Sequence, residues 1–147
     1  MSAKTISLMF DGYWRETNIS GVPKKAGIYV VYECSYNEWQ NSVSLLKLVY
    51  IGKSDDDANN RIANHEKWSQ WRRHCGATHE ICFSFSEVTI NSDRERAEAA
   101  LIYQHKPPVN DQYVYDFPFE ETTVRLTGKI ALLSAYFTVE GKKTFSR

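Results

Sequence analysis

Two short apolar stretches, each carrying a glycine, an isoleucine and a tyrosine in a row, constrain the fold most. Residues 26–32 (AGIYVVY) and 44–52 (SLLKLVYIG) are built largely of β-branched, aromatic and other apolar side chains. The first alternates clearly, with Ile28, Val30 and Tyr32 on one side and Tyr29 and Val31 on the other. Period-two alternation predicts strands, and the polar stretch 33–44 predicts a hairpin loop longer than a tight turn. Tyr29 and Tyr50 should therefore lie on neighbouring strands.

The rest of the chain predicts a small mixed sheet with helices. Strands are expected at residues 5–14, 79–88 and within the tail 119–147, and helices from the acidic run 55–57 to about Arg73 and from Ser92 to the prolines at 107–108. Ser92 and Glu95 have the spacing of a capping box. The order β-β-α-β-α followed by β indicates the α+β class, with a mixed or antiparallel sheet flanked by helices. We expect one domain over residues 1–147, with a β extension at about 113–147.

The bulk composition is typical neither of a nucleic-acid-binding protein nor of a membrane protein. The 147 residues include 18 basic and 18 acidic side chains, so contact with DNA would have to come from local patches. No apolar run approaches the ~20 residues that a membrane-spanning helix needs, and the first residues lack the features of a signal peptide. The three cysteines suggest no disulfide framework. We therefore expect a cytoplasmic protein with free thiols and no membrane partner.

Polar side chains of the first predicted helix recur on one face. Arg61, His65, Trp68 and Arg72 follow the spacing i, i+4, i+7 and i+11. Arginine offers phosphate a permanent charge and a planar fork of donors. The alternative is a solvated helix face with the indole of Trp68 tucked against the body.

Glu98 and the two tyrosines each have a structural and a chemical interpretation. Glu98 lies among alanines, which would let its helix pack close to the sheet, and a carboxylate with waters suits Mg²⁺; alternatively it pairs with Arg94 on the helix surface. Tyr29 and Tyr50 either fill a core or act in chemistry. A tyrosine with an ordinary pKa near ~10 acts as a base only when positive charge favours its phenolate. Lys53 and Arg61 are near enough in sequence to provide that charge.

Taken in order, these residues resemble the catalytic domain of the GIY-YIG nucleases over about residues 22–112. The matching positions are Gly27-Ile28-Tyr29, Tyr50-Ile51-Gly52, Arg61, His65, Glu98 and Asn110, the last approached through the phrase KPPVN. The resemblance implies an endonuclease that hydrolyses DNA with one divalent cation, Mg²⁺ or Mn²⁺, leaving 5′-phosphate and 3′-hydroxyl ends. It also implies a restriction-type, phage-associated or mobile-element enzyme.

The resemblance implies a role for each matching side chain. Tyr50 would be the general base, assisted by His65 and Lys53, and Arg61 would stabilise charge on the phosphate. Glu98 would hold the metal. Tyr29 and Asn110 would orient these groups.

Two features depart from the family pattern. The 20 residues between Tyr29 and Tyr50 exceed the short connector of most relatives, so the inserted loop either contacts substrate or is only an addition. Within these residues we also find no signature of an appended DNA-binding module, zinc finger or helix-turn-helix. Basic side chains for DNA are nevertheless available late in the first helix, namely Lys67, Arg72 and Arg73, next to two tryptophans that have a packing role as their alternative.

Three further questions stay open from the sequence. A non-catalytic nucleic-acid-binding or interaction module with the same fold is the alternative function, and the completeness of the residue set favours the enzyme. The oligomeric state is the second question, because a double-strand break from one active site implies either a homodimer or two successive nicks. Finally, Cys75, His79 and Cys82 resemble part of a zinc site but lack a fourth ligand, so we expect ordinary thiols.

Overall fold

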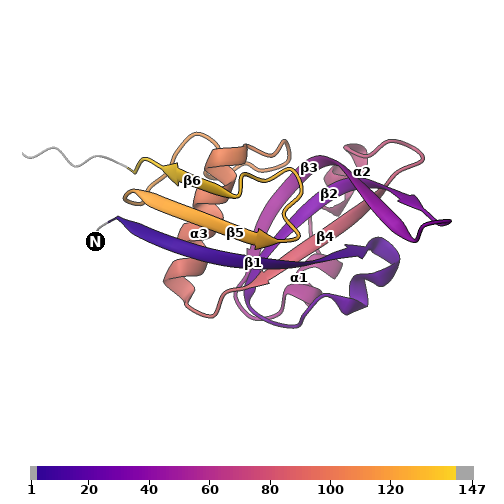
Figure 1. Cartoon of the computed structure of the whole chain (residues 1–147), viewed down its shortest axis with the longest axis horizontal. Helices are drawn as coiled ribbons and strands as arrows, with labels where there is room; N and C mark the ends of the chain where they lie inside the picture. Colours follow the sequence, from indigo (N-terminus) through magenta and orange to yellow (C-terminus); the bar gives the residue numbers. More distant parts are fainter. Residues whose placement is uncertain (1–2, 142–147) are drawn as a thin grey trace, which may run out of the picture.

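Six strands form one curled mixed sheet that is accompanied by few helices (Figure 1). The structure is a computed structural model that describes residues 3–141. Its strands are β1 (Lys4–Arg15), β2 (Gly27–Asn37), β3 (Ser42–Ser54), β4 (Glu80–Glu87), β5 (Thr122–Gly128) and β6 (Tyr136–Val139). Its helices are the 3₁₀ helix η1 (Glu16–Gly21), α1 (Ala58–Ala63), α2 (Trp68–Arg73) and α3 (Asn91–His105). The predicted α+β class is confirmed. The part of the predicted C-terminal strands beyond residue 141 lies outside the described residues.

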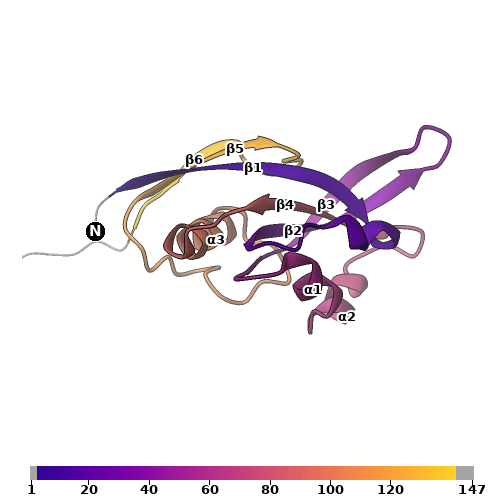
Figure 2. The ribbon, with the colours of Figure 1, turned by 90° about the horizontal axis from the view of Figure 1, so that it is seen from below.

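The long strand β1 joins the two halves of the sheet, whose order is β3-β2-β4-β1-β5-β6. Its first half runs parallel to β5, and its second half, from Asp11, runs antiparallel to β4. Figure 2 shows β1, β5 and β6 on one side of the molecule, with α1 and α2 across the β2–β3 hairpin from them. The first strand and the last two strands therefore belong to one sheet with the β2–β3 hairpin.

The predicted alternation along β2 separates two apolar cores. Ile28, Val30 and Tyr32 pack with side chains of β1, β5 and α3, whereas Tyr29 and Val31 pack with α1 and α2. Burying apolar side chains on both faces explains why β2 is hydrophobic at nearly every position. Of the two faces of β2, the one that carries Tyr29 borders the candidate active site.

The hairpin loop predicted for residues 33–44 is wrong in length. β2 continues to Asn37 and β3 begins at Ser42, so only residues 38–41 form the turn. The side chains of this stretch alternate between two faces. Cys34, Val43 and Leu45 belong to or pack against the core, whereas Ser35, Asn37, Ser42 and Ser44 lie on the other, more exposed face. The connector is thus an extension of the hairpin.

The single helix predicted from the acidic run to Arg73 is broken in two. Asp57 caps α1 by accepting the backbone N–H of Asn60 at 3.0 Å, as the acidic run suggested. The helix then ends because Asn64 turns its side-chain amide back onto the Asn60 carbonyl at 3.1 Å. The backbone N–H of Lys67 donates to the His65 ring before α2 begins. The expected common face of Arg61, His65, Trp68 and Arg72 is therefore absent.

Helix α3 is capped two residues before the predicted N-cap, Ser92, and without the capping box. This N-cap position is Ile90, which makes no side-chain capping bond. Arg94, buried and only 4% exposed, fixes this end by donating to the Val88 carbonyl and to the Asn91 side chain. The helix ends at His105, before the prolines, as predicted. No helix among residues 3–141 is long and apolar enough to cross a membrane.

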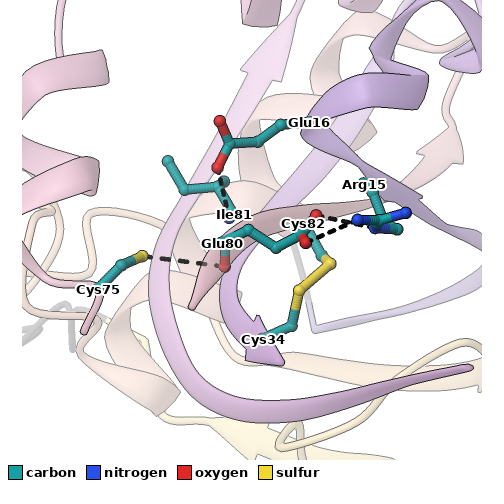
Figure 3. The surroundings of a disulfide bond; sticks show 7 residues. All are labelled: Arg15, Glu16, Cys34, Cys75, Glu80, Ile81 and Cys82. Atoms are coloured by element: carbon teal, nitrogen blue, oxygen red, sulfur yellow. Dashed lines mark hydrogen bonds and ion pairs between the residues drawn. A yellow bond between two sulfur atoms is a disulfide. The ribbon is translucent and has the colours of Figure 1, made fainter. Parts of the chain in front are cut away.

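The prediction of three free thiols is wrong. Cys34 on β2 and Cys82 on β4 form a disulfide across adjacent strands, with Cα atoms 6.2 Å apart (Figure 3). Cys75 is the free cysteine. The suggested zinc ligands are also used elsewhere, because His79 bonds to Glu33 at 2.7 Å and Cys82 is cross-linked. The cytoplasmic location, which was inferred partly from free thiols, stays a prediction.

Candidate active site

The residues predicted from the sequence to act together line two adjoining cavities. The larger, of about 700 Å³, is lined by Tyr29, Tyr50, Lys53, Ser54, Asp55, Asp56, Arg61, Glu98 and Gln112. The smaller, of about 220 Å³, is lined by Tyr50, Lys67, Glu98, Ile102, Asn110, Asp111, Gln112 and Tyr113. Tyr50 and Glu98 belong to both cavities. Side chains from β2, β3, α1, α3 and the loop after α3 thus meet at one place.

The two glycines of the apolar triplets allow this approach. Tyr29 lies directly opposite Gly52 in the antiparallel ladder. A Cβ on Gly52 would lie 2.4 Å from the Tyr29 hydroxyl oxygen, so the phenol ring crosses β3 where only glycine leaves room. At Gly27 a Cβ would lie 2.1 Å from the Ser86 carbonyl oxygen on β4. Each triplet therefore pairs a tyrosine with a glycine that makes space for close packing.

Asn110 holds the loop after α3 onto the outer edge of β3. Its side-chain oxygen accepts the Ile51 N–H at 3.0 Å, and its side-chain amide donates to the Ile51 carbonyl at 2.8 Å. The Val109 N–H adds a bond to the Val49 carbonyl at 3.2 Å. Because these contacts bracket Tyr50, Asn110 fixes the position of the tyrosine, and its amide is already engaged with backbone.

His65 lies behind Tyr50 as a neutral ring. Its ring centroid is 5.2 Å from that of Tyr50 and 4.4 Å from that of Trp71, and the side chain is fully buried. Burial, and then the nearby charge of Arg61, lower the pKa of His65 to about 4. Nδ1 accepts the Lys67 N–H, which leaves the proton on Nε2, an atom without a hydrogen-bond partner among the described residues. At neutral pH this ring offers a donor and no charge.

Arg61 presents its guanidinium to the cavity while it is paired with Glu66. The two nitrogens of the fork donate to the two oxygens of Glu66 at 2.7 and 3.1 Å. This pairing holds the pKa of Glu66 low, at about 2, and raises that of Arg61. The Glu66 side chain is 64% exposed, so the pair is a surface ion pair of small net stability. A phosphate could replace the carboxylate with the same bidentate geometry.

Glu98 is a half-buried carboxylate with no ion pair or hydrogen bond among residues 3–141. Burial raises its pKa to about 7; Lys53 opposes this rise, and Glu95 adds to it. The alternative pairing with Arg94 is not made, because the Arg94 guanidinium binds Asp55 at 3.1 Å. An unpaired carboxylate at the wall of a polar cavity is costly to ionise without a cation.

Tyr50 is protonated at neutral pH in the free protein. Burial, followed by the charge of Glu98, raises its pKa to about 12, although Arg61 acts in the opposite direction. The pKa of Tyr29 is also raised, first by burial. Lys53, which was expected to favour the phenolate, instead donates to Asp55 at 2.9 Å. Proton abstraction by Tyr50 would therefore require more positive charge than these side chains supply.

The predicted DNA-contacting residues are divided between the site and the surface. Lys67 lines the smaller cavity and donates to Asp111 at 2.8 Å. Arg72 and Arg73 are exposed at the end of α2, where Arg72 is paired with Glu16 on η1.

Several side chains at the site were missed from the sequence. Ser54, Asp55, Asp56 and Gln112 line the larger cavity, Asp111 and Tyr113 line the smaller one, and Glu66 holds Arg61. The acidic run was interpreted only as a helix start, and a Glu five residues after an Arg falls outside the usual helical spacings. The break at Asn64 makes that pair possible.

The comparisons with known proteins identified no relative of this chain. A scan against protein-family models, a search of curated proteins and a search of solved structures each found no match to this chain. A functional interpretation therefore rests on the side chains themselves.

Proposed function

We propose that this protein is an endonuclease of the GIY-YIG type that hydrolyses phosphodiester bonds in DNA with one divalent cation, Mg²⁺ or Mn²⁺. The supporting observation is the meeting of Tyr29, Tyr50, Arg61, Glu98 and Asn110, which are separated by up to 81 positions in sequence, around two adjoining cavities. A polar cavity that offers a cationic fork on one side and a carboxylate on the other suits a phosphate together with a metal.

The residues fit a single divalent cation. Glu98 is half-buried, has no partner among the described side chains and is hard to ionise alone. Mg²⁺ commonly binds through one or two carboxylates while keeping several waters and taking up phosphate oxygens, so one carboxylate beside an open cavity suffices. When bound there, the cation would stabilise negative charge on the phosphate and on the leaving oxygen.

Arg61 would bind the scissile phosphate by exchanging partners. Its fork now holds the exposed carboxylate of Glu66, and a phosphate diester presents two oxygens at similar spacing. Lys53 lies on the same cavity wall, and within residues 3–141 its ion pair is with an exposed aspartate, Asp55. Both cations can therefore approach the phosphate without breaking buried contacts.

Tyr50 would take the proton of the attacking water. This role requires that the pKa of Tyr50, which is about 12 in the free protein, be lowered. Glu98 is the second cause of its raised pKa, so neutralising that carboxylate removes part of the obstacle. His65 and Asn110 hold the phenol from behind and along β3. We assign them positioning roles, because His65 is buried and Asn110 is bonded to backbone.

A plasmid-nicking assay with Mg²⁺ tests the proposal. Wild type is compared with Glu98→Gln and with the control Glu95→Gln, an exposed carboxylate three residues earlier on α3. We expect nicking by wild type and the control, and a loss of about 100-fold or more in Glu98→Gln. If wild type does not nick any DNA, or if Glu98→Gln nicks equally well, the assignment is wrong.

The non-catalytic binding module remains the rival function. Two observations favour it, namely the high pKa of Tyr50 and the occupation of Arg61 by Glu66. In that case the wild-type protein would retard the migration of DNA in a mobility-shift assay at low salt. It would leave the DNA uncut at every Mg²⁺ concentration and pH tested.

A further inference from the structure

The outer part of the β2–β3 hairpin projects beyond the rest of the sheet. Pairing between β2 and β4 ends at Cys34, opposite Glu80. From Ser35 to Asn37 the strand β2 pairs only with β3, and the turn follows. Both ribbon views show this part of the hairpin extending past its neighbours (Figures 1 and 2).

The projection is braced where it leaves the sheet. The disulfide runs diagonally from Cys34, the last residue of β2 that pairs with β4, to Cys82, which lies opposite Tyr32. Beside it, Arg15 makes two bonds of 2.9 Å to the Glu80 carboxylate (Figure 3), and its guanidinium lies 3.5 Å from the ring centre of Tyr36. A cross-link, an ion pair and a cation–π contact thus hold the base of the hairpin in place.

The tip itself has a defined conformation that exposes one tryptophan. The side-chain oxygen of Asn37 accepts the backbone N–H groups of Trp39 and Gln40 at 3.0 and 3.2 Å. Across the turn, the Tyr36 hydroxyl donates to the Asn41 side chain at 2.9 Å. Trp39 is nevertheless 92% exposed. Because the turn is already ordered, a ligand that binds this exposed indole has to immobilise little of the backbone, which lowers the entropy cost of binding.

A shallow recess of about 480 Å³ lies beside this indole. It is lined by Ser35, Tyr36, Asn37, Glu38 and Trp39. Glu38 is exposed, and its carboxylate would repel phosphate but accept a hydrogen bond from a base amino group. Of the two aromatic side chains of the recess, Tyr36 is half-buried under the Arg15 guanidinium and Trp39 is the exposed one. One exposed indole beside Ser35, Asn37 and Glu38 offers too little apolar area for a membrane or a large protein interface. The recess and the indole together suit a ligand that consists of one flat, polar ring.

We propose that the hairpin tip binds an unpaired nucleobase, which stacks on Trp39 and whose amino group donates a hydrogen bond to the Glu38 carboxylate. Every base has a face that stacks on an aromatic ring, and a base paired inside a duplex has both faces covered by its stacked neighbours. The choice of DNA as the polymer rests on the function proposed above. The site is separate from the candidate active site, at the other end of the same two strands.

Spacing along β3 relates the two sites. Ser42, at the tip, and Tyr50, at the cavities, are eight positions apart on β3, or roughly 26 Å at ~3.3 Å per residue. Stacked DNA advances ~3.4 Å per nucleotide, so about eight nucleotides span the same distance. An oligonucleotide of about 12 nucleotides is therefore long enough to contact both places at once.

Binding of fluorescein-labelled oligonucleotides of about 12 nucleotides, single-stranded or as blunt duplex, tests the proposal in EDTA. The variants are Trp39→Ala and Trp39→Phe, and the control is Tyr136→Ala, an aromatic 64% exposed on β6 at the opposite edge of the sheet. For single strands we expect about tenfold weaker affinity in Trp39→Ala, a smaller loss in Trp39→Phe and none in the control. Duplex affinity should change little.

The outcomes separate this proposal from the proposed function. Equal affinity of wild type and Trp39→Ala for single strands, or no binding by wild type, overturns the tip site and leaves plasmid nicking to be judged alone. Loss of affinity in Trp39→Ala together with unchanged nicking at saturating DNA supports two separate sites. If Trp39→Ala weakens single-strand binding while wild type never nicks, the tip site stands and the nuclease assignment fails.

Discussion

Replacing Glu98 by glutamine should stabilise the protein, and the gain should depend on pH. The pKa of Glu98 rises from the ordinary 4.5 to about 7 in the folded chain, mainly because the carboxylate is buried. The folded state therefore holds this proton over a range in which the unfolded state has lost it, so stability falls as the pH rises from about 4.5 to about 7. At ~1.4 kcal/mol for each pH unit, the cost reaches about 3 kcal/mol above pH 7. Glutamine does not ionise and avoids it.

Urea denaturation in EDTA, followed by tryptophan fluorescence, measures this difference between about pH 4 and pH 8. The free energy of unfolding of Glu98→Gln minus that of wild type should grow by about 3 kcal/mol across the range. Other titrating groups cancel in the subtraction, and Glu38→Gln, on the exposed turn, is the control. A difference that stays flat with pH, or one that shrinks as the pH rises, would refute the idea of a buried carboxylate lacking a partner.

Three other predictions concern the contacts around the site. Gly52→Ala should destabilise the chain by about 1–3 kcal/mol in urea denaturation and reduce nicking, because the new Cβ would lie 2.4 Å from the Tyr29 hydroxyl; unchanged stability would contradict the close packing. Glu66→Gln should lower the KM for DNA several-fold by releasing Arg61, whereas a higher KM would mean that Glu66 mainly orients it. Thiol titration of the unfolded chain should find one free thiol before reduction and three afterwards; three before reduction would rule out the disulfide.

The sequence was sufficient where local alternation determines the structure. The period-two pattern of residues 26–32 placed Tyr29 and Ile28 on opposite faces, and the structure confirms this because each face has its own core to fill. The prolines after His105 ended α3 as expected. The grouping of distant side chains came from a motif, since no local pattern indicates that Glu98 faces the tyrosines.

The misses involve contacts that span the fold or depend on single side chains. The disulfide joins cysteines 48 positions apart, and pairing at such a distance cannot be inferred from spacing. The helix break depends on the Asn64 and His65 side chains, which compete for backbone groups that a helix would use. The hairpin was predicted too short because polar residues were taken for a loop, whereas they lie on one face of the strands and alternate with Cys34, Val43 and Leu45 on the other.

The most direct test of the central claim is the location of a bound divalent cation. Crystals grown with MnCl₂ and measured at the manganese absorption edge should give one anomalous peak within about 2.2 Å of a Glu98 carboxylate oxygen, inside the cavity that Tyr50 and Arg61 also line. The same peak should be absent from Glu98→Gln. A manganese ion bound elsewhere with Glu98 uncoordinated, or a peak that survives the substitution, would contradict the account.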